Sequence, residues 1–191
     1  MKNKKYKILA LFGKSGAGKD TIQKWLVDTQ NMNGIISCTT RPKRDNEING
    51  VDYYFLNNYK FDTIQLHGNM LETTCFNNWS YGTPISSLDK NKINVGVFNI
   101  QGIKSLLEDT RLEILPIYIK CFDKVRLMRC LLREEDPDCH EICRRFLADE
   151  KDFEGISFNY ETYENSVAND LNDFYLLDLP KVKSFIKDIN N

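Results

Sequence analysis

The chain has 191 residues, of which 41% are hydrophobic and 28% charged, and its formal net charge at pH 7 is -1. That length fits one catalytic unit but not two ordinary domains, and the ordinary globular composition does not indicate disorder. The near-neutral charge excludes an overall basic field, so we expect small-molecule partners, with no nucleic acid and no membrane.

The amino terminus is basic and runs directly into a short apolar stretch, residues 8–12. That stretch is too brief for a signal-peptide core or a membrane span, so a cytoplasmic location is expected. The six cysteines contain no C-x-x-C pair, as expected of reduced thiols. Cys139, His140 and Cys143 lack a second ligand pair at zinc-like spacing, and no zinc site is predicted.

Apolar runs alternate with segments of helical periodicity along most of the chain. Residues 7–12 and 21–27 predict a strand and a helix on either side of a glycine-rich turn. Further strands are expected at residues 34–38, 94–98 and 115–119, and further helices at residues 103–107 and 125–132. This alternation predicts an α/β fold in which helices cover a parallel sheet.

Two segments interrupt that pattern. Residues 41–91 are rich in Asn, Tyr and Thr and contain strand candidates at 52–55, 71–76 and 79–82, which predicts an inserted mixed α/β lobe that binds substrate. A charged stretch within residues 133–145 predicts a short lid between two helices. The core then comprises residues 1–40 and 92–191 of a single domain, with a terminal helix restarting after Pro180.

The glycine-rich turn matches the phosphate-loop pattern G-x-x-x-x-G-K, directly between the predicted strand and helix that this motif requires. Backbone N–H groups of such a loop surround phosphate oxygens, and its lysine reaches the outer phosphates of ATP. The predicted ATP-binding residues here are Gly13, Lys14, Ser15, Gly16, Ala17, Gly18, Lys19, Asp20 and Thr21.

Asp20 stands where this motif normally carries a Ser or Thr hydroxyl that binds magnesium. Its carboxylate can hold Mg²⁺ directly or through water, because magnesium accepts carboxylate oxygens readily. A second interpretation, equally open, is an aspartate at a helix start that accepts hydrogen bonds from backbone donors.

The segment Ser37-Cys38-Thr39-Thr40-Arg41-Pro42-Lys43-Arg44, followed by Glu47 and by residues 49–53, resembles the guanylate kinase family. The resemblance continues through Glu72, Tyr81-Gly82-Thr83, Gln101-Gly102, three later arginines and Asn169-Asp170, and covers nearly the whole chain in order. It implies a P-loop NTPase fold of three α/β/α layers and transfer of a phosphoryl group from ATP to GMP or dGMP, with Mg²⁺.

The same resemblance implies the acceptor site. Arg41, Arg44, Tyr53 and Tyr81 would hold the 5'-phosphate, and Glu47 would orient an arginine. The base would be chosen by Ser37, Glu72 and Thr83, since one carboxylate accepts both N1–H and the exocyclic amine of guanine. Adenine presents no proton there, so guanine is preferred. Asn99 completes the predicted set.

Phosphoryl transfer requires alignment of two nucleotides and neutralisation of charge on the group in flight. The predicted catalytic residues are Lys19, Arg129, Arg133 and Arg145, with surface salt bridges as the alternative for the arginines. Arg126 and Arg144 lie nearby in the sequence, and for both a structural role is the alternative to a catalytic one. Asn169 resembles the family residue beside the adenine, although Asn-Asp pairs also form turns.

The third core strand departs from the family pattern, because Val97 and Asn99 occupy positions where aspartates are usual. One hypothesis is that the Asp20 carboxylate takes over the magnesium-binding role of these two missing aspartates. Two other functions therefore stay open: a kinase for a different phosphorylated acceptor, and a non-catalytic module that binds phosphorylated ligands. The sequence also leaves open the choice between GMP and dGMP and between a monomer and a homodimer.

Overall fold

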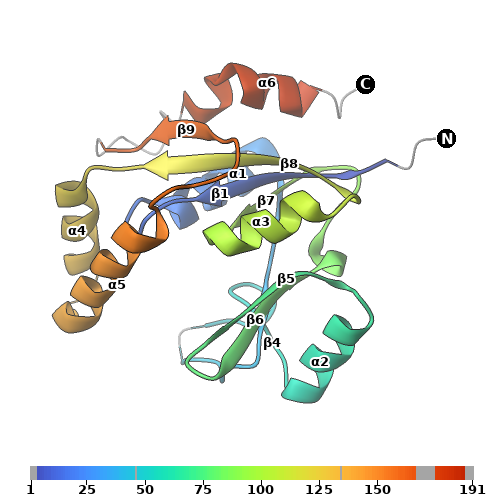
Figure 1. Ribbon diagram of the computed structural model, residues 1–191, viewed down its shortest axis with the longest axis horizontal. Coiled ribbons are helices and arrows are strands. Elements are labelled where there is room, and N and C mark those ends of the chain that lie inside the picture. Colours follow the sequence, from blue (N-terminus) through green and yellow to red (C-terminus); the bar gives the residue numbers. More distant parts are fainter. Residues whose placement is uncertain (1–3, 46, 134, 167–174, 188–191) are drawn as a thin grey trace.

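The computed structural model describes residues 4–45, 47–133, 135–166 and 175–187. Its larger sheet has five parallel strands in the order β2-β7-β1-β8-β9 (Figure 1). The strands are β1 (Tyr6–Phe12), β2 (Asn33–Gly34), β7 (Ile93–Val97), β8 (Leu112–Lys120) and β9 (Glu161–Glu164). The central strand β1 is nearly all apolar because both of its faces are covered.

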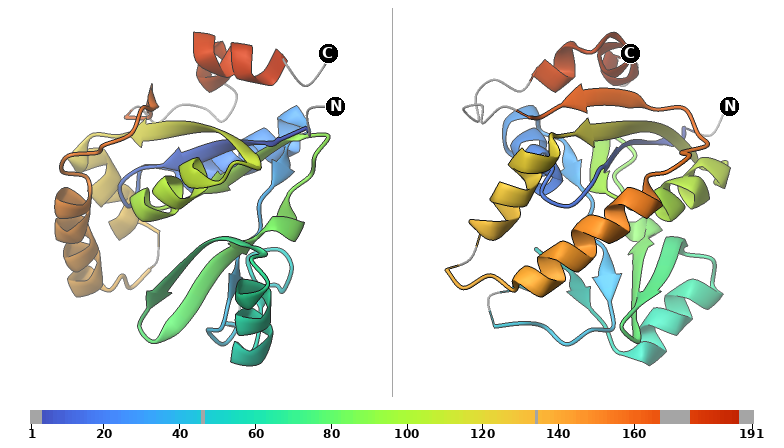
Figure 2. Two further views of the ribbon diagram at one scale, coloured as in Figure 1. Left: turned by 45° about the vertical axis from the view of Figure 1, so that its right-hand side comes forward. Right: turned by 60° about the vertical axis from the view of Figure 1, so that its left-hand side comes forward.

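Helices cover both faces of this sheet, as Figure 2 shows. α1 (Lys19–Gln30) and α6 (Pro180–Lys187) cover one face and α3 (Ile100–Glu108) covers the other, whereas α4 (Asp123–Leu131) and α5 (Cys139–Asp152) lie at the end of the sheet where β8 ends (Figure 1); η2 (Tyr175–Asp178) precedes α6. Alternate residues of β1 point to opposite faces. Leu9 and Leu11 pack with α1 and α6, whereas Ile8 and Ala10 pack with α3. The α/β fold with three layers is thereby confirmed.

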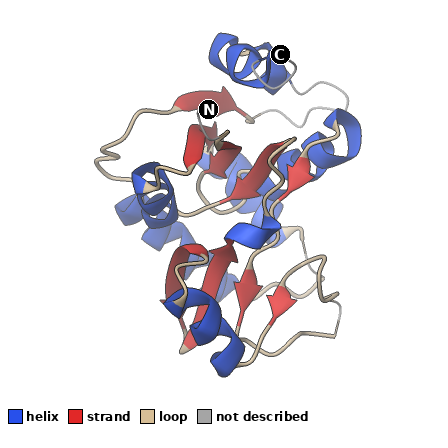
Figure 3. Cartoon of the chain, turned by 90° about the vertical axis from the view of Figure 1, so that its right-hand side faces the viewer, coloured by secondary structure: helices blue, strands red, loops and turns tan. Residues whose placement is uncertain are grey.

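A second, mixed sheet has the strand order β4-β3-β6-β5, and Figure 3 shows the two sheets in separate halves of the molecule. Its strands are β3 (Cys38–Thr39), β4 (Tyr54–Phe55), β5 (Met70–Phe76) and β6 (Trp79–Pro84). The helix α2 (Asn58–Leu66) packs Phe61 against Gly82 of β6, and η1 (Ile85–Ser87) follows β6. We call residues 38–84 the small-sheet lobe.

The strand expected at residues 34–38 is wrong as a single element. Gly34 pairs with Val95 in the large sheet, whereas Cys38 pairs with Gly82 in the small sheet. The residues between them cross from one sheet to the other, although their apolar character resembles that of a strand. The chain returns to the large sheet through residues 85–92.

Two elements lack a signal in the sequence. The helix α2 buries only Phe61 fully, so its apolar residues do not follow a helical period. The edge strand β9 reads Glu-Thr-Tyr-Glu and buries only Tyr163 fully, so it contains no apolar run. Other bounds lie within a few residues of those expected, and α6 begins at Pro180.

Candidate functional site

The phosphate loop connects β1 to α1 at the carboxyl end of the large sheet, where open α/β sheets bind ligands. Gly16 and Gly18 have φ angles of +77° and +89°, which glycine adopts most readily. A Cβ on Gly16 would lie 2.3 Å from the carbonyl oxygen of Arg126, and one on Gly18 would lie 2.6 Å from the amide of Asn165. The loop therefore needs glycine at both positions.

Lys19, the first residue of α1, folds back over this loop. Its Nζ donates hydrogen bonds to the carbonyl oxygens of Gly13 at 2.8 Å and Lys14 at 3.1 Å. Desolvation lowers the pKa of Lys19, while the nearby carboxylates of Asp20 and Asp149 oppose that shift. The ammonium is thus held at the loop before any nucleotide arrives.

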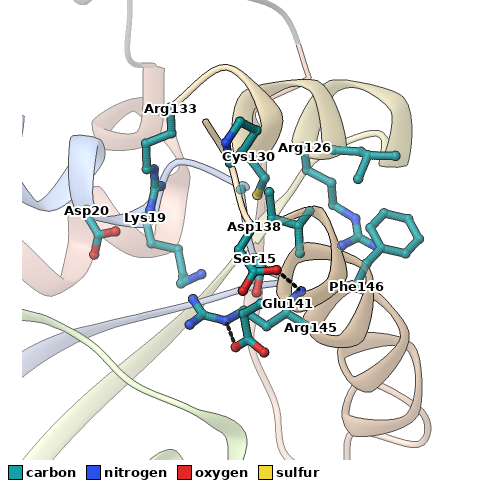
Figure 4. A pocket seen from close by; sticks show the side chains of 14 residues that line it. Ser15, Lys19, Asp20, Arg126, Cys130, Arg133, Asp138, Glu141, Arg145 and Phe146 are labelled. Atoms are coloured by element: carbon teal, nitrogen blue, oxygen red, sulfur yellow. Dashed lines mark hydrogen bonds and ion pairs between the residues drawn. The ribbon is translucent and has the colours of Figure 1, made fainter. Parts of the chain in front are cut away.

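A pocket of about 280 Å³ lies between the phosphate loop, α4 and α5 (Figure 4). Lys19, Arg133 and Arg145 line it together with the acids Asp20 and Glu141. We call it the donor pocket. Arg126 also lines it, so the pocket combines a phosphate loop with four cationic side chains, as binding of a polyphosphate requires.

Glu141 holds one of these cations in place. Its carboxylate accepts hydrogen bonds from Nε of Arg145 and Nε of Arg144, both at 2.6 Å. These two bonds lower the pKa of Glu141 to about 2. Arg129 does not line this pocket, but its Nη1 lies 3.7 Å from where a Cβ on Gly18 of the phosphate loop would stand, and 3.4 Å from Sγ of Cys121.

Asp20 is exposed in the first turn of α1 and lines both the donor pocket and a cleft that reaches Glu47 and Tyr53 of the small-sheet lobe. Magnesium commonly uses one or two carboxylates, with water and substrate phosphates as its other ligands. No group of three candidate metal ligands occurs among the described residues. Asp20 supplies one carboxylate at the donor pocket, which is within the number that a magnesium ion held mainly by nucleotide phosphates uses. Thr21 follows it and is also exposed.

Arg41, Glu47, Tyr53 and Tyr81 come together in the small-sheet lobe. Arg41 and Glu47 form a bidentate pair with N···O distances of 2.6 and 3.0 Å, and Glu47 also accepts the Arg44 N–H at 2.8 Å. The hydrogen bond from Arg41, with the Arg44 N–H, lowers the pKa of Glu47 to about 2. The rings of Tyr53 and Tyr81 lie 6.1 Å apart, and the Arg41 guanidinium is 5.9 Å from the Tyr53 ring.

A second pocket, of about 370 Å³, lies between the small-sheet lobe and the end of β7. We call it the acceptor pocket; Ser37, Glu72 and Asn99 line it. Thr83 is fully buried, and its hydroxyl donates to Oε1 of Glu72 at 2.6 Å and lies 3.0 Å from Oγ of Ser37. Burial raises the pKa of Glu72, with the Thr83 hydrogen bond as an opposing cause.

Asn99 has a second contact, since its Oδ1 accepts the Gly102 N–H at 2.6 Å and caps α3. Val97 and Asn99 line the acceptor pocket and also a third pocket that contains Gly13 and Lys19. The end of β7 therefore borders both the acceptor pocket and the phosphate loop. Asn169, expected beside a nucleotide base, lies outside the described residues.

Sequence reasoning missed two acids of α5. Asp149 accepts the backbone N–H of Ser15 at 2.7 Å, and Glu150 accepts from Nζ of Lys14 at 2.6 Å. Acidic residues on an amphipathic helix ordinarily face solvent, so nothing in the local sequence marks them.

Within the described ranges, no helix is long and apolar enough to cross a membrane.

A family model described as guanylate kinase matches residues 5–186. The chain is 41% identical over 107 residues to a guanylate kinase of Malacoplasma penetrans, an alignment that covers 53% of this chain and 55% of that protein, or about half its length. It is 32% identical over 193 residues to a guanylate kinase of Wigglesworthia glossinidia brevipalpis, covering 96% of this chain and 88% of that one.

Among solved structures, the chain resembles a guanylate kinase from Anaplasma phagocytophilum with a TM-score of 0.63 and 19% identity. That alignment covers 97% of this chain and 87% of the other. At this identity the likeness concerns the fold, and it agrees with the three-layer architecture.

Proposed function

Because the chain belongs to the guanylate kinase family, we propose that it transfers the γ-phosphoryl group of ATP to GMP or dGMP. The products are ADP and GDP or dGDP. The observation that carries this proposal is the hydrogen-bonded set of Ser37, Glu72 and Thr83 in a pocket that adjoins the phosphate loop through β7.

The acceptor pocket suits guanine. The Glu72 carboxylate accepts hydrogen bonds from the ring N1–H and the exocyclic amine, and the Thr83 hydroxyl fixes its orientation. Adenine would place a ring nitrogen without a proton against this carboxylate. Each unsatisfied buried group of this kind is unfavourable by about 1 to 3 kcal/mol, which supports preference for guanine.

The acceptor phosphate would bind at Arg41, Arg44, Tyr53 and Tyr81. Glu47 holds the Arg41 guanidinium in one orientation, so little side-chain entropy is lost when phosphate binds. The two phenols add neutral donors without further positive charge. Glu47 and Tyr53 share a cleft with Asp20, the residue after Lys19, so an acceptor oxygen bound there would face the phosphate loop.

At the donor, an oxygen of the acceptor phosphate forms a bond to the γ-phosphorus while the bond from that phosphorus to the β–γ bridging oxygen breaks. Lys19, Arg133 and Arg145 stabilise the negative charge on the group in flight. Asp20 would hold a magnesium ion, which would supply further neutralisation of phosphate charge. Arg129 would add positive charge beside Gly18 of the phosphate loop, and Asn169 remains a predicted adenine contact.

The proposal is tested by ADP release with ATP and Mg²⁺ against GMP, dGMP, AMP, CMP, UMP and dTMP. Guanine-dependent release that is lost in Lys19→Ala and Glu72→Gln is the expected result. Glu108→Gln, at the far end of α3 from Asn99, is the matched control and should match the wild type. Release with another acceptor would identify a different kinase, and GMP binding without turnover would identify a binding module.

The same preparation tests the other predictions of location and assembly. Cell fractionation addresses the predicted cytoplasmic location, and light scattering distinguishes a monomer from a homodimer. The relative kcat/KM values for GMP and dGMP give the ribose preference, because they report differential binding of the transition state.

A further inference from the structure

Arg126 on α4 is a buried cation with a solvent-exposed fraction of 1% for its side chain. Its Nε donates to Asp123 at 2.8 Å, its Nη1 to Asp149 at 3.3 Å and its Nη2 to Glu150 at 2.6 Å. Its guanidinium also lies 3.6 Å from the ring centre of Phe146. A buried charge is tolerated only with such partners, so these contacts fix α4 against α5.

The same two acids of α5 contact the phosphate loop. Oδ2 of Asp149 accepts both from Arg126 and from the backbone N–H of Ser15. Glu150 uses one carboxylate oxygen for Arg126 and the other for Lys14. A continuous set of ionic and hydrogen-bonded contacts therefore runs from α4 through α5 to the loop; we call it the Arg126 network.

An independent contact joins the loop to α4 directly. Gly16 packs so closely on α4 that a Cβ there would lie 2.3 Å from the Arg126 carbonyl oxygen and 2.9 Å from Sγ of Cys130. The loop is thus seated against the backbone of α4 on one side and against carboxylates of α5 on the other.

These two helices also carry cations of the donor pocket. Arg145 lies four residues before Asp149 on α5, which places both on one face of the helix, and Arg133 follows the end of α4. A shift of either helix relative to the loop would move a cation relative to the bound phosphates. Misplacement by about 1 Å at such a site lowers turnover by about 100-fold.

We infer that Arg126, Asp149 and Glu150 are positioning residues that hold the phosphate loop in register with Arg133 and Arg145. This inference rests on the proposed phosphoryl transfer. The acceptor pocket is built from the small-sheet lobe and the end of β7 and includes no member of the Arg126 network. Loss of the network therefore lowers kcat while the KM for GMP stays the same.

The first test replaces Asp149, because removal of the buried Arg126 risks unfolding the chain. Asp149→Ala removes the acceptor for the Ser15 N–H and should lower kcat by about 10- to 100-fold. Asp149→Asn keeps an acceptor oxygen and should recover most of that loss. Asp109→Ala is the matched control, since Asp109 pairs with Arg111 in the turn before β8.

The second test combines Asp149→Ala with Arg133→Ala. If Asp149 acts by placing the loop relative to Arg133, its removal has a smaller effect once Arg133 is absent, so the two losses in kcat are less than multiplicative. Each variant is assayed well below its own Tm, so that loss of folded protein does not enter kcat.

The positioning role is contradicted if Asp149→Ala lowers Tm but leaves kcat unchanged, or if its effect multiplies fully with that of Arg133→Ala. An active wild type with either result contradicts this inference alone. A wild type that turns over no guanine nucleotide contradicts the proposed function and the positioning role together.

Discussion

Glu72 belongs to the predicted guanine site and Glu47 to the predicted phosphate site, and the pKa values of their carboxyl groups are shifted in opposite directions. Burial raises the pKa of Glu72 above its ordinary value of 4.5, whereas Arg41 and the Arg44 N–H lower the pKa of Glu47 to about 2. A raised pKa means that the folded protein protonates this carboxyl at a higher pH than the unfolded chain does. Mild acid therefore neutralises Glu72 first.

We predict that the KM for GMP rises as pH falls toward 4.5, because protonated Glu72 no longer accepts both guanine donors. The Arg41–Glu47 pair is intact at pH 4.5 and is lost only as pH falls toward about 2, so it does not change the KM in this window. The measurement is the KM for GMP against pH. For Glu72→Gln, whose turnover is expected to be lost, the Kd for GMP is measured against pH instead and should show no acid limb; an acid limb that persists in this variant contradicts the assignment.

At the same scale, the sequence identified the residues of both pockets when they lie in contiguous motifs. Residues 13–19 and 37–53 each place several chemically matched side chains within a few positions; the first segment lines the donor pocket and the second lines a cleft, and Asp20 lines both. Glu150 and Asp149 differ, since Ser15 and Asp149 are separated by 134 residues along the chain. No local pattern encodes a contact of that kind.

Among the elements, α3 begins at a residue with two contacts. Asn99 lines the acceptor pocket and caps the helix through the Gly102 N–H. Asn99→Ala should lower the free energy of unfolding by about 1 kcal/mol. Without nucleotide, this corresponds to a fall in Tm of about 2–4 °C for a chain of this size. Asn99→Ser keeps a capping oxygen and should retain Tm, which separates the cap from any role in binding.

The hairpin of β5 and β6 turns through two residues in the left-handed region, Asn77 at φ +49° and Asn78 at φ +64°. Two-residue turns of this type favour Asn followed by Gly. Asn78→Ala should lower the free energy of unfolding by about 1 kcal/mol, because alanine tolerates this conformation poorly. Asn78→Gly should not lower it, and thermal unfolding of the pair decides; equal Tm values would contradict the role of backbone strain.

The success of sequence reasoning differed between elements for physical reasons. The strands β1, β7 and β8 are buried on both faces and read as apolar runs. The edge strand β9 and the helix α2 each bury a single large side chain fully, so neither produces a period. Residues 35–37, which cross between the sheets, look like a strand in the sequence because they include apolar side chains. Ile35 is buried as a strand residue would be, although it lies in the crossing.

On the scale of the whole molecule, the small-sheet lobe contacts α5 at the hairpin tip, where the Arg144 guanidinium lies 5.9 Å from the Phe76 ring. Trp79 pairs with Phe76 across the two strands, and 36% of its surface is exposed to solvent. We predict that binding of GMP with a non-hydrolysable ATP analogue closes the lobe over the donor pocket and buries Trp79 further.

That closure is measured by tryptophan emission, since the chain has only Trp25 and Trp79. In Trp25→Phe, the two nucleotides together should shift the emission of Trp79 to shorter wavelength. In Trp79→Phe the shift should disappear. An unchanged spectrum of Trp25→Phe in the presence of both nucleotides would contradict closure at this hairpin.

The strand order also sets the sequence of events during synthesis. The small-sheet lobe is continuous in the chain, but β1 pairs with β8 more than about 100 residues later. At about 5–20 residues per second, the apolar strand β1 waits roughly 5–20 s on the ribosome for that partner. The lobe can fold during this interval, while the exposed β1 is a natural site for chaperones, and slower translation would lengthen its exposure to aggregation.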